Sequence, residues 1–198
     1  MHAIRSLAIL GALALSTPAL AGTVYNVDAS HSRVGFSVTH MMVSTVRGEF
    51  GTFTGTVEWD PKNVGATKVQ GTVGIASINT REAKRDEHLK SPDFFDVASF
   101  PEAKFVSTGV KNVKQDSFDL IGDLTIRGVT KSVTVQVKTV SPEFKDPWGN
   151  VKAGTRATAT INRKDFGITW SAALDGGGVV VSDEVGIDID LELVKKQG

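Results

Sequence analysis

The sequence predicts an all-β domain, arranged either as a closed barrel or as a sandwich. Apolar and polar residues alternate in about eight short runs after Gly22, separated by turn residues. The last run is the clearest, with apolar residues at positions 185, 187, 189, 191 and 193. Side chains of a strand point alternately to opposite faces, so each run needs a sheet with one apolar and one polar face. Many short strands in one domain are typical of barrels and sandwiches.

Residues 1–21 have the pattern of a secretory signal peptide. Arg5 supplies a positive charge, Ser6 to Leu15 is a short apolar stretch, and Ala19-Leu20-Ala21 is a small-x-small cleavage site. The alternative is a buried N-terminal helix. We expect residues 22–198 to form a single domain that is exported to the periplasm. No later segment is long and apolar enough for a membrane helix, and the lack of an N-x-S/T acceptor favours a bacterial source.

The composition argues against several classes of protein. The chain has no cysteine, which excludes disulfides, thiolate metal sites and thiol nucleophiles. Residues 22–198 carry one basic residue fewer than acidic residues. Nucleic-acid binders normally show a concentrated basic face, so we expect no nucleic-acid partner.

Eight candidate strands follow from the alternation. They cover residues 32–40, 50–59, 68–78, 103–110, 117–127, 132–140, 152–161 and 185–194. Arg127-Gly128 joins two of these runs, and the segment from Asp60 to Asn63 has the composition of a turn. Short loops of this kind favour antiparallel neighbours.

One segment departs from the strand pattern. From Arg81 to Phe100 helix formers dominate, and we expect a short helical insert over about residues 81–96. Thr80 is the expected N-cap, and Ser91-Pro92 is a second expected helix start. The charged residues of the insert are explained by a solvated face. A second interpretation is that its phenylalanines close one mouth of the barrel.

The predicted inward faces are apolar and contain many small residues. His40 is nearly the only ionisable residue on them, and the small residues include Gly55, Gly71, Gly122, Ala153, Ala157 and Ala159. Small inward side chains leave room inside a barrel, although any one of them could instead face a bulky partner. We therefore predict an apolar cavity.

Several motifs in order resemble those of the YceI-like family. They are Tyr25-x-Val27-Asp28-x-x-His31-Ser32-x-Val34-x-Phe36-x-Val38-x-His40, Arg85-Asp86-x-His88-Leu89-x-Ser91-x-Asp93-Phe94-Phe95-Asp96, Phe100-Pro101-x-Ala103-x-Phe105-x-Ser107, Gly122-x-Leu124-Thr125-Ile126-Arg127-Gly128-Val129-Thr130 and Phe166-Gly167-Ile168-x-Trp170. The resemblance implies an exported, extended, eight-stranded antiparallel β-barrel of lipocalin-like type. It also implies that the barrel encloses an amphiphile, typically a polyisoprenoid chain such as a quinone or prenyl lipid. Homodimers are a further implication, and no catalytic residue is carried over.

We therefore expect a lipid-binding protein for storage or transport of an isoprenoid or other long-chain lipid, with no cofactor, metal or catalytic residue. The residues expected to contact the ligand are Phe36, Val38, His40, Met42, Phe53, Ile75, Phe94, Phe95, Phe105, Leu120, Leu124, Val135, Ala157 and Ile187, with Arg85 as the head-group contact.

Other interpretations stay open. One is an enzyme acting on a lipid or quinone through His40, and another is a ligand-free structural protein of the envelope. A zinc site from His31, His40 and His88 is disfavoured, because an odd separation along one strand puts His31 and His40 on opposite faces.

Overall fold

Antiparallel strands make up most of this computed structural model, which describes residues 22–138, 140–173 and 177–197. The strands are β1 (Thr23–Val27), β2 (Arg33–His40), β3 (Ser44–Phe50), β4 (Phe53–Trp59), β5 (Lys68–Gly74), β6 (Ile78–Asn79), β7 (Glu102–Lys111), β8 (Ser117–Ile126), β9 (Val129–Lys138), β10 (Phe144–Lys145), β11 (Val151–Asn162) and β12 (Val181–Lys195). The helices are α1 (Ala83–Lys90) and the short 3₁₀ helices η1 (Ala29–His31), η2 (Val64–Ala66), η3 (Ile75–Ser77) and η4 (Arg163–Phe166). The predicted signal peptide lies outside the described residues.

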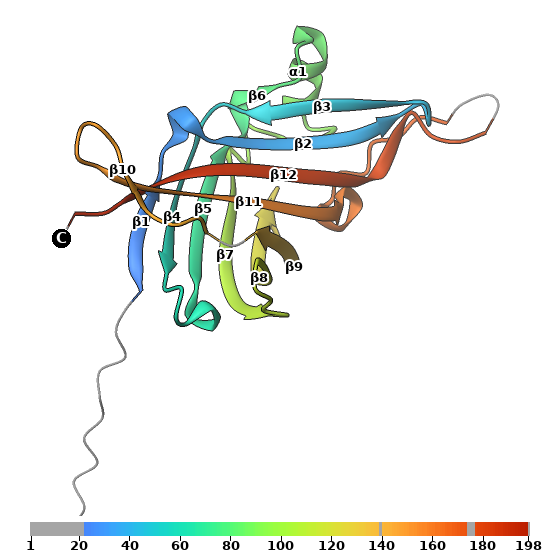
Figure 1. The fold of residues 1–198 in the computed structure, drawn as a ribbon. Coiled ribbons are helices and arrows are strands. Elements are labelled where there is room, and N and C mark those ends of the chain that lie inside the picture. The colour runs from blue at the N-terminus through green and yellow to red at the C-terminus, as the bar shows by residue number, and fades with distance from the viewer. Residues whose placement is uncertain (1–21, 139, 174–176, 198) are drawn as a thin grey trace, which may run out of the picture.

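The strands close into an eight-stranded antiparallel barrel (Figure 1). The pairs β1–β2, β3–β4 and β5–β6 each act as one interrupted strand, because both members pair with the same neighbouring strands. Around the barrel, these three strands are followed in chain order by β7, β8, β9, β11 and β12. Closure comes from β12, which pairs with β11 on one side and with β1 and β2 on the other. The predicted all-β barrel class is confirmed.

Most strand predictions are close to the observed bounds. The turn at Arg127-Gly128 is a two-residue hairpin loop, with φ of 50° and 72° and with Ile126 paired to Val129. Positive φ at both positions is the arrangement that hairpin loops of two residues favour. The predicted strand 68–78 is interrupted by η3. The strands β1 and most of β3 were not predicted.

The helical insert is shorter than expected. α1 spans Ala83–Lys90, and its N-cap is Glu82, whose carboxylate accepts hydrogen bonds from the backbone N–H groups of Lys84 and Arg85. Thr80 is therefore not the N-cap. It is buried, and its hydroxyl donates to Asp86. The second predicted helix, at Ser91-Pro92, does not form, because residues 91–99 make successive turns instead.

One end of the barrel holds a tightly packed core, called here the packed end. Its side chains come from six strands, β1, β4, β8, β9, β11 and β12, and from the segment after β9, and they are Tyr25, Val57, Trp59, Phe118, Leu120, Val137, Val140, Ala153, Ala157 and Leu193. Trp59 and Phe118 stack with ring centroids 5.7 Å apart, and Leu193 is fully buried. Each strand of the barrel runs from this end toward the opposite end, called here the hollow end.

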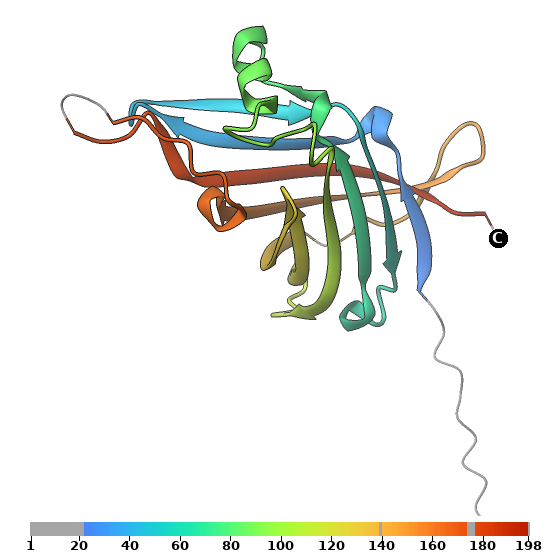
Figure 2. The ribbon, with the colours of Figure 1, turned by 180° about the vertical axis from the view of Figure 1, so that it is seen from behind.

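Few residue pairs join the neighbouring barrel strands β9 and β11. These strands pair at two positions, Ala157 with Val137 and Thr158 with Gln136, both close to the packed end. Toward the hollow end η4 packs against β9, and Figure 2 shows this side of the wall. No helix in the described part of the chain is long and apolar enough to cross a membrane.

Candidate functional site

A cavity of about 620 Å³ occupies the hollow end. Its wall is made by residues from strands all around the barrel, namely β2, β3, β4, β5, β7, β8, β9, β11 and β12, and part of the packed core, including Phe118 and Val137, forms its floor. The wall is dominated by valine, isoleucine, leucine and phenylalanine. Phe36, Val38 and Ile187 point inward but are only partly buried, because they face the cavity.

The structure places nearly all of the predicted contact residues around this cavity. Those at the cavity wall are Phe36, Val38, His40, Phe53, Ile75, Phe94, Phe95, Phe105, Leu120, Leu124, Val135, Ala157, Ile187 and Arg85. The exception is Met42, which lies in the β2–β3 turn with its side chain exposed. The alternation that directs even-numbered side chains of β2 inward ends at His40, where the chain turns back.

Aromatic contacts attach the α1 segment to the barrel rim. The ring of His88 lies 5.0 Å from that of Phe94 and 5.4 Å from that of Trp170, both edge to face. On the other side of the insert, Phe95 packs edge to face on Phe50 at 6.2 Å. Phe94 and Phe95 both line the cavity, so the insert covers part of it with these phenylalanines.

Arg85 is held against the cavity wall by Thr80. Its Nε donates to the Thr80 hydroxyl and its Nη2 to the Thr80 carbonyl, both at 2.7 Å. Asp86 accepts from the same hydroxyl and from the Thr80 backbone N–H, the latter at 2.9 Å. A guanidinium fixed in this way presents a positive charge at the edge of an apolar cavity, where it can attract an anionic or strongly polar group.

A second arginine at the cavity was missed by the sequence analysis. Arg163, in η4, is 4% exposed and lines the cavity. Its guanidinium donates to the carbonyls of Ile168, Trp170 and Ser182 at 2.7–2.9 Å and to Asp183 at 3.0 Å. Because Arg163 lies in η4 and not in a strand, the prediction that His40 is nearly the only ionisable residue on the inward strand faces did not include it.

Arg127 ties three loops together at the hollow end. Its side chain donates to the carbonyls of Gly167 and Pro92, each at 2.8 Å. The hairpin loop between β8 and β9 thereby holds both the η4 segment and the segment after α1. These two segments, which both line the cavity, are called here the cover, and the contacts of Arg127 keep them in place.

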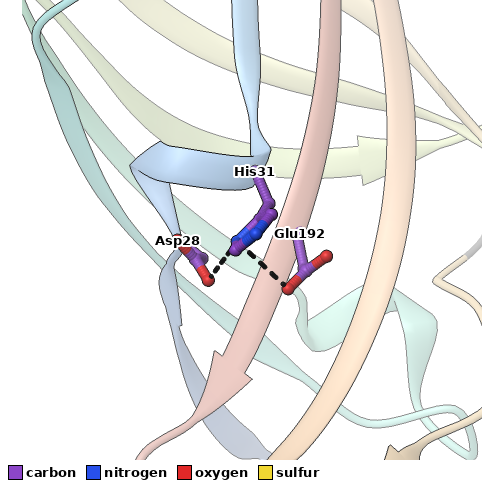
Figure 3. A group of neighbouring side chains, drawn as sticks. All are labelled: Asp28, His31 and Glu192. Carbon is purple, nitrogen blue, oxygen red and sulfur yellow. Dashed lines mark hydrogen bonds and ion pairs between the residues drawn. The ribbon is translucent and has the colours of Figure 1, made fainter. Parts of the chain in front are cut away.

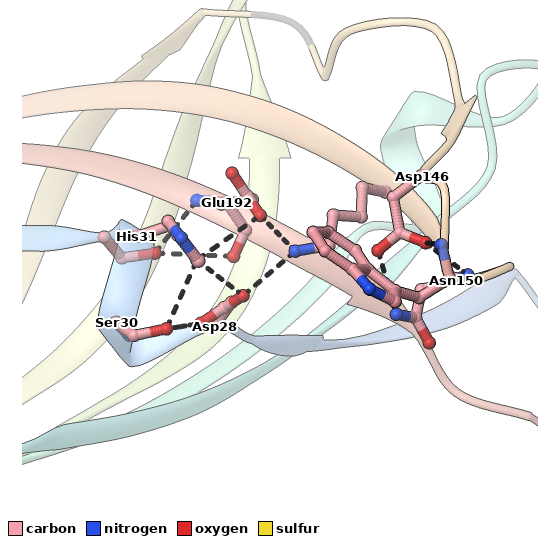
Figure 4. A network of polar contacts seen from close by, with 9 residues as sticks. Asp28, Ser30, His31, Asp146, Asn150 and Glu192 are labelled. Carbon is pink, nitrogen blue, oxygen red and sulfur yellow. Dashed lines mark hydrogen bonds and ion pairs between the residues drawn. The ribbon is translucent and has the colours of Figure 1, made fainter.

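A polar network lies at the break between β1 and β2, outside the cavity wall. His31 Nδ1 is 3.0 Å from Asp28 and 3.7 Å from Glu192 (Figure 3). Hydrogen bonds from Ser30 and His31 hold the pKa of Asp28 well below its usual value. Figure 4 shows this network together with Asp146 and Asn150 of the neighbouring loop.

The three side chains of Figure 3 could in principle hold a metal ion, since their donor atoms lie within 4.8 Å of one another. The ammonium group of Lys152 already bridges the two carboxylates, at 3.2 Å from Asp28 and in direct contact with Glu192. A cation would have to displace this lysine. The arrangement is therefore best explained as an ion-pair network that fixes the strand break.

Comparison with curated proteins gives relatives that match along nearly the whole chain. A UPF0312 protein of Pseudomonas savastanoi is 39% identical over 195 residues, covering 95% of this chain and 97% of the relative. A UPF0312 protein of Pseudomonas fluorescens is 40% identical over 195 residues with the same coverage.

Solved structures share the fold. BcnA of Burkholderia cenocepacia superposes with a TM-score of 0.73 and 26% identity, covering 84% of this chain and 98% of BcnA. A polyisoprenoid binding domain from Saccharophagus degradans superposes with a TM-score of 0.64 and 16% identity, covering 88% of this chain and 99% of that domain. The YceI-like domain model matches residues 25–193. The chain therefore belongs to the YceI-like family.

Proposed function

We propose that the protein binds a polyisoprenoid or similar amphiphilic chain, such as a quinone or prenyl lipid, inside the barrel cavity. The observation that carries this proposal is the cavity of about 620 Å³ with its apolar wall. That volume lies within the range of small-molecule binding sites. The Saccharophagus degradans domain with the same fold is described as polyisoprenoid binding, which supports the same ligand class here.

The energy of burial is sufficient for such a ligand. Each methylene moved from water to an apolar wall gains about 0.8 kcal/mol, so ten carbons gain roughly 8 kcal/mol. Ordering of the chain and loss of its free motion offset part of this gain. Because the wall contacts are apolar, we expect binding of the tail to be insensitive to salt.

Selection among lipids would fall to the polar groups at the edge of the cavity. Arg85 is the head-group contact we propose, because Thr80 fixes its position at the wall of the apolar cavity. His40 and Lys84 line the same cavity and would add polar contacts. We propose storage or transport rather than catalysis, since Arg85, His88 and Arg163 are engaged in hydrogen bonds that position the cover.

We also propose that the protein is exported to the periplasm after removal of residues 1–21. The support is the charged, apolar and small-residue order of that segment. N-terminal sequencing of protein isolated from its source tests this step, and a chain that begins at Gly22 is the expected result.

Native mass spectrometry of the purified protein, followed by organic extraction and identification of the released molecules, tests the binding function. The expected result is one isoprenoid or acyl lipid per protein chain. A mass equal to that of the protein alone, with no uptake of an added quinone or prenyl lipid, contradicts the proposal and favours a ligand-free structural role.

Matched tryptophan variants test whether the cavity is the binding site. Leu124→Trp and Ala159→Trp fill the cavity, whereas Asp123→Trp and Thr160→Trp place the same side chain on exposed neighbouring positions. We expect at least a tenfold loss of affinity in the first pair, corresponding to about 1.4 kcal/mol, and wild-type binding in the second. Equal binding by all four folded variants would place the ligand elsewhere.

A further inference from the structure

An exposed apolar tip projects from the hollow end of the barrel. It consists of Met41, Met42 and Val43 in the β2–β3 turn and of Val179 in the segment before β12. Their side chains are 45%, 67%, 86% and 39% exposed, respectively. A hydrogen bond from the Met41 N–H to the Val180 carbonyl, 2.8 Å long, joins the two segments. Figures 1 and 2 show the β2–β3 turn and the start of β12 at the same end of the molecule.

The tip continues the apolar surface of the cavity to the outside. His40, Val46, Val180 and Val181 flank the tip residues in the chain and line the cavity. Charged residues are also scarce in the described segments that form and adjoin the tip: none of residues 41–46, 170–173 and 177–182 is charged. In a chain in which 22% of residues are charged, an uncharged apolar surface beside a cavity marks an interaction site.

The turn itself carries residues that are unfavourable for its backbone. Met41 and Met42 are the two central residues of the turn, with φ of 48° and 60°. Turns with positive φ at both central residues favour Asn-Gly, because longer side chains crowd the backbone in this region. Two methionines at these positions reduce the stability of the turn while placing flexible apolar side chains in solvent. A contact outside the barrel would give these exposed methionines a function that the turn itself does not require.

The size and charge of the tip favour a lipid bilayer over a second copy of the chain. A stable protein interface buries about 800 Å² on each partner, far more than four side chains at a hairpin tip can supply. A bilayer needs no matching surface, and apolar side chains that enter its acyl region gain energy without an opposing charge. The apolar lining then forms a continuous path from the acyl region to the cavity.

We propose that the tip inserts into the surface of a neutral phospholipid bilayer and docks the hollow end of the barrel against it. This proposal rests on the proposed lipid-binding function, because it assigns the membrane from which the cavity takes its lipid. Docking adds no covalent step. It depends on the exposed side chains Met41, Met42, Val43 and Val179.

Flotation with phosphatidylcholine vesicles tests the proposal. The decisive variant is Met41→Asn with Met42→Gly, which removes the apolar side chains and introduces the residues that the turn favours. This variant is expected to be at least as resistant to thermal unfolding as the wild type, so lost binding cannot be ascribed to misfolding. Its partition onto vesicles is expected to fall at least tenfold. Trp148→Ser is the matched control, because Trp148 is 84% exposed but lies in the loop between β10 and β11, beside the packed end.

The wild type is expected to float equally well when the salt concentration is raised about tenfold, because no charge pairing is involved. Flotation lost in Trp148→Ser but kept in the Asn-Gly variant would overturn the proposal. The proposal is also overturned if the wild type does not float and is a dimer in sedimentation while the Asn-Gly variant is a monomer, since the tip then contacts a second copy.

Uptake of a prenyl lipid from detergent micelles is measured in parallel and reports on the proposed function alone. Uptake without flotation refutes docking only, and flotation without uptake refutes the lipid-binding function only.

Discussion

The two ends of the barrel are built from the same strands but are filled differently. At the packed end, Tyr25, Trp59 and Leu193 are almost completely buried and belong to one packed cluster. At the hollow end, Phe36, Val38 and Ile187 also point inward but remain only partly buried at the cavity wall. An alternating sequence decides which face of a strand is inside, whereas side-chain volume decides whether the inside is filled.

This difference indicates that stability and binding depend on separate regions. Close packing at one end supplies the buried apolar area that a domain without disulfides needs. The other end can then present apolar surface to a ligand without being required for folding. If this division is correct, substitutions at the packed end mainly lower the free energy of unfolding, whereas substitutions at the hollow end mainly lower the affinity for the ligand.

The largest expected effect is on the packed end. Trp59→Ala or Phe118→Ala removes one of two stacked rings and should lower the free energy of unfolding by about 3–5 kcal/mol, because a cavity is left behind. Phe36→Ala, at the hollow end, should cost only about 1–2 kcal/mol, since its side chain is partly exposed already. Urea denaturation measures both. Equal losses would mean that the two ends do not differ energetically.

Arg163 is an exception within the hollow end, because it is buried and stabilises the cover. Arg163→Ala leaves the carbonyls of Ile168, Trp170 and Ser182 without their donor, and we expect a loss of about 3 kcal/mol. Arg163→Lys should recover little of this, because one ammonium group cannot reach acceptors placed around a planar guanidinium. The measurement is chemical unfolding combined with amide hydrogen exchange across residues 163–171. Wild-type stability in Arg163→Lys would show that only the charge matters.

The strands that the sequence predicts well are those with clear alternation. In β8, Phe118, Leu120 and Leu124 share one face and Asp119 and Asp123 lie on the other, and the predicted and observed bounds nearly coincide. β1 was missed because Val24, next to the buried Tyr25, is apolar but exposed, which obscures the alternation. β3 was missed for the opposite reason, since most of its residues are exposed and few are apolar.

The cavity was predictable as a property of the whole barrel but less so residue by residue. Ala157 and Ala159 do line the cavity. Gly122, by contrast, makes room for a neighbour, because a Cβ there would lie 2.3 Å from the ring of Phe105. Arg163 gave no sequence signal at all, since most of its partners are backbone carbonyls brought together only by the folded loop.

A smaller effect is expected at the strand break near the packed end. Asp28 has a lowered pKa in the folded protein because of its hydrogen bonds to Ser30 and His31. Its contribution to stability is therefore full above the pKa of an unfolded Asp, about 3.9, and is lost as the pH falls through the lower folded value. Asp28→Asn should cost about 2 kcal/mol at neutral pH, and the difference from wild type should shrink in acid.

Urea denaturation at a series of pH values measures this effect. Asp116→Asn is the control, because Asp116 is exposed and its ion pair with Lys138, also exposed, is as long as 4.0 Å. It should leave the pH dependence unchanged. A difference between Asp28→Asn and wild type that is constant down to strongly acidic pH would mean that the carboxylate of Asp28 is not the group that stabilises the break.

The smallest effect at neutral pH concerns Tyr25, the one tyrosine of the chain. Burial, together with the hydrogen bond to Glu143 at 2.6 Å, raises its pKa from 10.0 to about 12. Between these values the unfolded chain releases the phenolic proton while the folded protein retains it, so this source of stability is full below pH 10 and is lost as the pH rises toward 12. Tyr25→Phe should cost about 1 kcal/mol at neutral pH, because one hydrogen bond is lost, and should remove this alkaline loss. The stability curves of variant and wild type should therefore converge as the pH rises.

Because the chain has a single tyrosine, the absorbance of tyrosinate in the folded protein measures the same pKa directly. A midpoint near that of free tyrosine would show that the packed end admits water around Tyr25, and would weaken the contrast between the two ends.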